Sequence, residues 1–157
     1  MATYRMSLAS AASAATLAVP FSHLWNPHTT KRLRVTEIHL ANTTAVATNV
    51  GILRTSTIGT TPTTALATAV IAQAHNKDIA AASGAQTNGG TYATAPVCDT
   101  NTAFLERAII PATIGAGIFF TFPVDEAIEI PPGQGLALCA ATAVATAATI
   151  TTFVWRE

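Results

Sequence analysis

The sequence contains very little charge. Only 10% of its 157 residues are Asp, Glu, Lys or Arg, whereas about 25% is typical of soluble proteins. Its formal net charge at pH 7 is +0, so it lacks the basic excess with which nucleic-acid-binding proteins neutralise phosphates. The one basic cluster, Lys31, Arg32 and Arg34, lies in a strand-like run and is better explained as the solvated start of a strand. We therefore expect no nucleic acid as a partner.

Long apolar runs and cysteines are also scarce. No run of about 18 uncharged residues is apolar enough to span a membrane, so we expect no membrane partner. The segment from Met6 to Pro20 superficially resembles a secretory signal, but Ala and Ser dominate it. Two cysteines, Cys98 and Cys139, are too few for a disulfide framework. We predict that both are reduced thiols, with a bond between them as the alternative.

Recognisable catalytic and metal-binding patterns are missing as well. The chain has no Gly-x-Ser-x-Gly motif and no Cys-His pattern that would activate a nucleophile. His23 and His28 are five residues apart across an Asn-Pro turn, which is not a metal-ligand spacing. Asp125 and Glu126 are adjacent, so in a strand they would point to opposite faces rather than share a proton. We predict that the protein is not an enzyme and holds no metal or cofactor.

Small uncharged residues make up the chain instead. Half of the residues are hydrophobic but only 6% are aromatic, and the sequence contains 33 alanines and 27 threonines. A surface of Thr, Ser, Asn and Ala with no net charge has little electrostatic protection against association. One interpretation is an uncharged soluble domain. The interpretation we favour is a subunit whose surface is mostly covered by other subunits.

The pattern of β-branched residues and turns predicts an all-β sandwich or barrel. Strand-like runs recur between Pro- and Gly-rich turns, at residues 15–25, 31–43, 48–61, 118–123, 127–130, 136–142 and 149–157. In the second run the apolar parity changes between Val35 and Ile38, which predicts a β-bulge or burial on both faces. In the run "IFFTFP" we expect Ile118, Phe120 and Phe122 to face the core.

Two segments do not fit this pattern. Residues 63–75 suit either a short helix or a strand, and residues 76–102 read as a long excursion rich in Gly, Asn and Ser. At the beginning of the chain we predict an extended N-terminal arm over residues 1–18, ordered or disordered, before a single β-sandwich domain over 19–157. Its bulky residues are the candidate interface anchors: Tyr4, Arg5, Met6 and Leu8.

Near the end of the chain, "PPGQG" (131–135) joins two strand-like runs. Proline restricts the backbone before such a turn and glycine accepts a positive φ within it, so the segment predicts a hairpin or a corner. This ending, "PPGQGLAL" followed by "TFVWRE", resembles the last strands of small jelly-roll capsid decoration (cement) proteins of tailed bacteriophages. The segments "LWNPHTTKRLRVTEIHLANT" (24–43) and "RTSTIGTTPTTA" (54–65) are similar to their early region.

The resemblance implies a jelly-roll-like antiparallel sandwich and a virion protein at the capsid surface. It implies that the major capsid protein and other copies of the chain, as a homotrimer, are the partners. The resemblance carries over no catalytic residue. The alternatives are another virion structural part, such as a head-fibre base or tail component, and a jelly-roll module that binds a carbohydrate or receptor.

Overall fold

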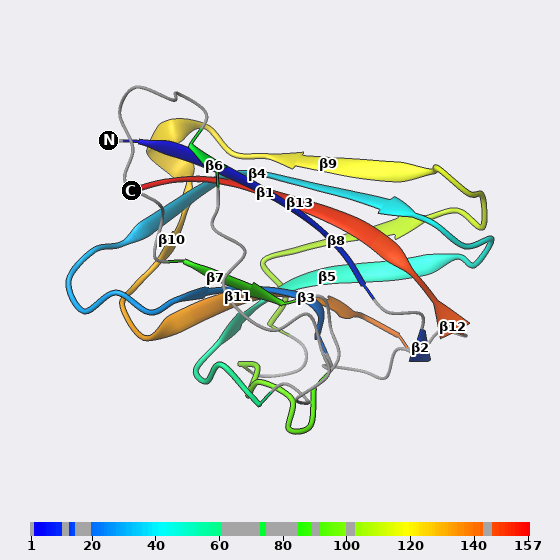
Figure 1. The fold of residues 1–157 in the computed structure, drawn as a ribbon. Helices are drawn as coiled ribbons and strands as arrows, with labels where there is room; N and C mark the ends of the chain where they lie inside the picture. The colour runs from blue at the N-terminus through cyan, green and yellow to red at the C-terminus, as the bar shows by residue number, and fades with distance from the viewer. Residues whose placement is uncertain are drawn as a thin grey trace.

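The chain folds into two antiparallel β-sheets packed face to face, as the computed structural model in Figure 1 shows. The structure describes residues 2–10, 13–14, 20–60, 73–74, 85–88, 92–99, 103–142 and 146–157. One sheet has the order β10-β4-β13-β1-β6, and β9 pairs with the second half of β4. We call it the β13 sheet. Its strands are β1 (Thr3–Ala9), β4 (Leu33–Asn42), β6 (Gln73–Ala74), β9 (Gly117–Thr121), β10 (Ile128–Ile130) and β13 (Thr149–Arg156).

The other sheet has the order β7-β3-β11-β5-β8, and we call it the β11 sheet. Its strands are β3 (Pro20–Asn26), β5 (Thr48–Thr55), β7 (Gln86–Asn88), β8 (Glu106–Ile110) and β11 (Gln134–Ala140). A separate short pair joins β2 (Ser13–Ala14) to β12 (Thr146–Ala147), and a single 3-10 turn, η1 (Val124–Glu126), separates β9 from β10.

The strand order is that of a jelly roll. Taking β9 and β10 as one interrupted edge strand, the main strands in chain order are β1, β3, β4, β5, β8, β9/β10, β11 and β13. Numbered from one to eight, they give the sheet orders 1-8-3-6 and 2-7-4-5, the paired Greek keys of a jelly roll. The predicted all-β, jelly-roll-like sandwich is therefore confirmed.

Alternating side chains from the facing sheets fill the core. Leu24 and Leu138 from the β11 sheet and Leu40 and Phe153 from the β13 sheet belong to one buried cluster. The predicted bulge in β4 is confirmed, because its pairing with β13 shifts register between Val154 and Trp155. The extra residue keeps both Val35 and Ile38 buried although their parity differs.

The "PPGQG" segment is a corner between the sheets. Strand β10 belongs to the β13 sheet and β11 to the β11 sheet, so the chain crosses the sandwich here. Gly133 has φ +68 and its N–H donates to the carbonyl of Asn26 at 2.9 Å. A left-handed φ favours glycine because it has no Cβ.

The segment that was expected to form an arm is described at residues 2–10 and 13–14, and there it belongs to the sheets. Strand β1 pairs with β13 from Thr3 opposite Arg156 to Ala9 opposite Ile150. Tyr4 and Met6 are buried, because the alternation Tyr4-Met6-Leu8 turns one apolar face of β1 to the core. Most of the predicted 63–75 element lies outside the described residues, apart from β6.

Candidate functional site on the outer face of the β13 sheet

The outer face of the β13 sheet carries large apolar side chains that are exposed along β9 and at the start of β13. The pairing of β4 with β9 sets His39 beside Phe119 and Ala41 beside Gly117, and on the other side of β4 Ala41 is paired with Ile150. Phe119 is 70% exposed and Ile150 is 45% exposed. These side chains point outward because their neighbours along each strand, Phe120 and Thr151, point into the core.

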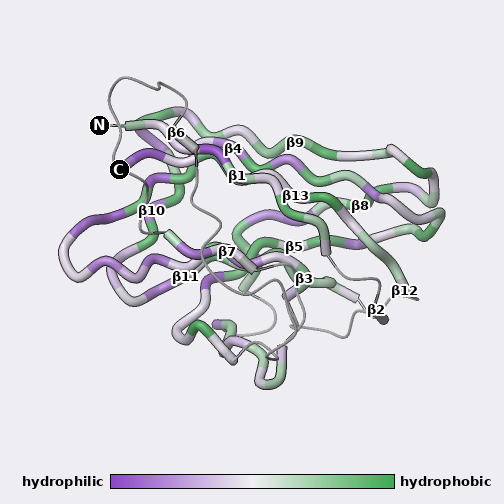
Figure 2. The backbone as a smooth tube through the Cα atoms, viewed as in Figure 1, coloured by the Kyte–Doolittle hydropathy of each residue, from purple (hydrophilic) through white to green (hydrophobic). Residues whose placement is uncertain are grey.

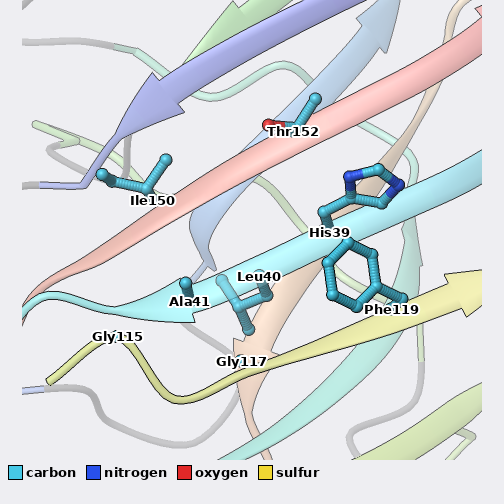
Figure 3. Close-up of a pocket in the computed structure, with 8 residues that line it drawn as sticks. All are labelled: His39, Leu40, Ala41, Gly115, Gly117, Phe119, Ile150 and Thr152. Atoms are coloured by element: carbon cyan, nitrogen blue, oxygen red, sulfur yellow. The ribbon is translucent and has the colours of Figure 1, made fainter.

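Between these side chains lies a shallow hollow of about 190 Å³. Figure 3 shows Phe119 and His39 on one side of it and Ile150 and Thr152 on β13 at the other. The hollow exists because Ala41 and Gly117, paired between the large residues, are small. A Cβ at Gly117 would lie 2.6 Å from the carbonyl oxygen of Leu40, so only glycine fits there without a shift.

An aromatic pair with a polar support borders the hollow. The rings of His39 and Phe119 have centroids 4.5 Å apart and are tilted by 59°. The Nε2 atom of His39 lies 2.9 Å from a carboxylate oxygen of Glu37, which accepts its hydrogen bond. The hydroxyl of Thr152 is hydrogen-bonded to Ser7. This arrangement offers a fixed apolar surface with polar edges, which suits contact better than covalent chemistry.

The hollow adjoins one end of the sandwich, where the described residues of the β4–β5 and β8–β9 connections carry no charge. The sequence contains no Asp, Glu, Lys or Arg at 38–53, 108–124 or 130–155. We call the surface formed by residues 43–47, 111–117 and 148–150 the neutral end. Ile114 in it is 68% exposed, and Ile109 in the adjoining strand β8 is 73% exposed. Figure 2 shows this end in pale to green colours, while the β3–β4 loop is mostly purple.

A buried asparagine, Asn42, holds the neutral end together. Its side-chain amide donates to the carbonyl oxygens of Val46 at 2.9 Å and Pro111 at 3.1 Å. Its side-chain oxygen accepts a hydrogen bond from the hydroxyl of Thr48 at 3.1 Å. Its backbone bonds to Ala116 and Gly115, each at 2.8 Å. Asn42 thus bonds to the β4–β5 connection and to the β8–β9 connection at once. These two connections therefore form one continuous, ordered surface.

Charge gathers at the other end of the sandwich. There Glu129 accepts from Arg32 and Arg34, each at 3.1 Å. His28 lies 3.5 Å from the carboxylate of Glu157. The side chains of Arg32, Arg34 and Glu129 are partly exposed, so the two ion pairs among them contribute little to stability. The two ends therefore differ in chemistry, and the neutral end is the one suited to a dry protein contact.

The outer face of the β11 sheet is covered instead of bare. Cys139, Ala137 and Leu53 form a second buried cluster against Cys98 and Phe104, which belong to the connection between β5 and β8. The ring of Phe104 lies where a Cβ of residue 51 would stand, at 2.1 Å, so glycine at position 51 admits it.

This covered face also encloses a histidine. His23 is buried, and its Nε2 lies 2.8 Å from the hydroxyl oxygen of Thr55. Burial lowers the pKa of His23 to about 4, because the charged imidazolium loses its hydration. Its ring centroid lies 6.5 Å from that of Tyr92. His23 is therefore a structural residue that is neutral at physiological pH.

The four residues proposed as anchors lie on two different faces of β1. Tyr4 and Met6 are in the core, where Tyr4 stacks on Trp155 with centroids 6.0 Å apart. Leu8 is half-buried and packs against the core, while Arg5 is exposed on the outer face. Trp155 is buried and Trp25 half-buried. The alternation of apolar and polar residues from Tyr4 to Ala9 was the signal that could have identified β1.

Sequence reasoning missed the residues of the hollow. It placed Phe119 on the face of its strand opposite the core but gave it no role. The signal available was a large aromatic at a solvent-facing position, in a stretch without charge. Among the described residues, no three His, Cys, Asp or Glu side chains are grouped closely enough to hold a metal ion. No helix within the described ranges has the length and apolar character of a membrane span.

No protein-family model matches this chain, and no match to a curated protein was found.

Proposed function

We propose that this chain is a structural protein of a virus particle, a capsid decoration protein that binds the shell through the neutral end and the adjoining hollow. The observation that carries the proposal is the exposure of Phe119, 70%, and Ile150, 45%, beside the hollow, which adjoins a neutral end where Ile114 is 68% exposed. A contiguous exposed apolar patch on a folded protein is the usual mark of a contact site. The resemblance of the sequence to decoration proteins supplies the kind of partner.

The rest of the molecule supports this role. A decoration protein needs a rigid body, and the jelly roll with Asn42 fixing its neutral end supplies one. It also needs a surface that loses little hydration when it docks. A surface of Ala, Thr, Ile and Gly has few charged groups to desolvate, so its burial costs less than that of the charged end.

Binding to empty heads tests the proposal. The heads are assembled from the major capsid protein encoded in the same genome, and bound protein is measured after sedimentation. We expect the wild-type chain to saturate the heads and Phe119→Asp to bind at least about ten-fold more weakly, since a buried anchor is typically worth more than 1 kcal/mol. Val97→Asp is the matched control, because Val97 is 57% exposed but lies in the cover of the β11 sheet. Equal binding by the wild-type and Phe119→Asp chains would contradict the proposal.

The expected homotrimer is tested separately by light scattering on the purified chain. A mass three times that of the 16.1 kDa chain supports the trimer. If the wild-type chain is a monomer and still saturates the heads, the decoration role stands and the predicted homotrimer is wrong. Binding to tail or fibre components instead of heads would favour a different virion part.

A carbohydrate-binding module is the second candidate, favoured by one observation. The aromatic pair of Phe119 and His39, with Glu37 hydrogen-bonded to it, lies open beside the hollow. An exposed ring with nearby polar groups can stack on a sugar and hydrogen-bond its hydroxyls. A glycan array decides between the two, because specific binding that Phe119→Asp abolishes would favour the module.

A further inference from the structure

Two thiols face each other beneath the cover of the β11 sheet. Cys139 is fully buried on β11, and Cys98 is half-buried in the segment 92–99, which lies between β7 and β8. Their sulfur atoms are 3.8 Å apart although the residues are 41 positions apart in the chain. A disulfide needs about 2.05 Å, so the remaining gap is about 1.8 Å. A loop-borne side chain can close a gap of this size by rotation and a small shift.

We propose that Cys98 and Cys139 form a disulfide under oxidising conditions, which locks the segment 92–99 onto β11. The described main chain of this segment is held to β5 and its continuation. Ser56 N–H donates to Val97, Asp99 N–H donates to Arg54, and Thr94 N–H donates to Thr60. Its contact with β11 is made through side chains, in the cluster of Cys98 with Cys139 and Ala137. A bond would therefore add a covalent link to a second strand.

The surroundings of the two sulfurs assign them different roles. The hydrogen bond from Cys139 lowers the pKa of Cys98, which burial and Asp99 oppose. The same hydrogen bond and the burial of its thiol raise the pKa of Cys139. Because the thiolate is the nucleophile and Cys98 is the more exposed residue, Cys98 reacts first and Cys139 resolves.

The oxidant is a small-molecule disulfide, such as oxidised glutathione. The Cys98 thiolate attacks one sulfur of it, forming a mixed disulfide and releasing one glutathione thiolate. That thiolate takes the proton of Cys139. The Cys139 sulfur then attacks the Cys98 sulfur and expels the second glutathione thiolate, which is protonated by solvent. Two protein thiols are oxidised, and one oxidised glutathione is reduced to two molecules of glutathione.

Resolution by Cys139 becomes easier after the first step. The negative charge of the Cys98 thiolate helps to raise the pKa of Cys139, and this charge is absent once the Cys98 sulfur is in a mixed disulfide. The second sulfur is then already adjacent to the bond it must attack, and the mixed disulfide should be short-lived.

Mass spectrometry of the native full-length chain tests the proposal. The chain is incubated with oxidised glutathione, quenched with acid, and alkylated in denaturant so that only remaining thiols react. We expect the main product to have lost two hydrogen atoms, to resist alkylation, and to yield a Cys98–Cys139 linked peptide. We also expect Tm to rise by roughly 5–10 °C over the reduced chain, as closing a loop of this length implies.

Single-cysteine variants separate the two roles. Cys139→Ala should accumulate a stable glutathione adduct on Cys98, because nothing resolves it. Cys98→Ser should remain unmodified, because the remaining thiol on β11 is buried. The proposal is overturned if the native wild-type chain acquires only a lasting glutathione adduct, if both cysteines stay reduced, or if the linked form melts no higher than the reduced form.

Discussion

The two sheets of this sandwich share one core, but their outer faces differ in how far their side chains are buried. The outer face of the β11 sheet lies under the connection between β5 and β8, and His23, Cys139 and Leu53 are buried there. The outer face of the β13 sheet presents Phe119 and Ile150 to solvent. A strand that is covered on both sides is expected to be apolar throughout, as "GLALCA" in β11 is. The described residues place no such cover over Phe119, and we propose that it contacts a surface outside the chain.

The largest effect on stability is expected from the removal of residues 1–10. Loss of a loose arm would leave the stability of the domain unchanged, whereas loss of a sheet strand would lower it. The deletion takes β1 from its pairing with β13 and exposes the partners of Tyr4 and Met6. We expect a loss of about 5 kcal/mol or more in the free energy of unfolding, from two large buried side chains and the ladder. Circular dichroism melting measures it, with Arg5→Ala as the control for an exposed change. If the truncated chain melts at the same temperature as the full chain, residues 1–10 are an arm and not part of the sheet.

The next largest effect is a dependence of stability on pH, which comes from His23 on the covered face of the β11 sheet. The pKa of His23 is about 4 in the folded chain and about 6.5 when unfolded. Between these values the unfolded state binds more protons, so stability is complete above pH 6.5 and falls as pH drops to 4. The expected loss is about 3 kcal/mol.

Urea unfolding at pH 7 and pH 4.5 measures this loss. Carboxylates also titrate in this range, so the comparison is with His23→Gln, which should lose distinctly less stability on acidification. Identical pH dependence in the two chains would show that His23 is hydrated or charged in the fold.

A smaller effect on stability is expected when a side chain is enlarged, and its size should differ between the outer faces of the β11 and β13 sheets. A methyl group at Gly135 would lie 2.4 Å from His23 Nε2 and from the Thr55 hydroxyl oxygen. We expect Gly135→Ala to cost about 2 kcal/mol through overpacking. Ala41→Val adds carbon atoms beside the open hollow and should change stability by less than about 0.5 kcal/mol. Denaturant midpoints for both variants measure the difference, and equal costs would show that the two faces are packed alike.

The smallest effect on stability is expected at Phe119. Because the side chain is largely exposed and contacts His39, Phe119→Asp should cost about 0.5 kcal/mol. Differential scanning calorimetry measures it. A large loss of stability would make Phe119 a structural residue, and a loss of head binding by the variant would then say nothing about the surface.

The sequence predicted the strands that carry a clear local signal. The parity change between Val35 and Ile38 located the bulge, and "IFFTFP" located β9 with Phe120 inward. Strand β8 was missed, because Glu106 and Arg107 make its first half polar and its edge position leaves most of it exposed. Strand β1 was taken as an arm, since its partner β13 lies at the other end of the chain.

The site was harder to predict than the fold. The hollow requires Ala41, Gly117 and Ile150 to be aligned on three strands, and this register depends on non-local pairing. The nearness of Cys98 to Cys139 depends in the same way on where the connection folds back. Neither the alignment of the hollow residues nor the nearness of the two cysteines can be predicted from a local pattern of residues.

Hydrogen exchange on the chain, alone and bound to empty heads, tests most directly whether the outer face of the β13 sheet is the contact surface. We expect amides of β9 and of residues 111–116 to exchange more slowly in the bound chain, while those of residues 93–99 keep their rate. Slower exchange at residues 93–99 with no change at β9 would contradict this expectation, and would place the contact on the covered face.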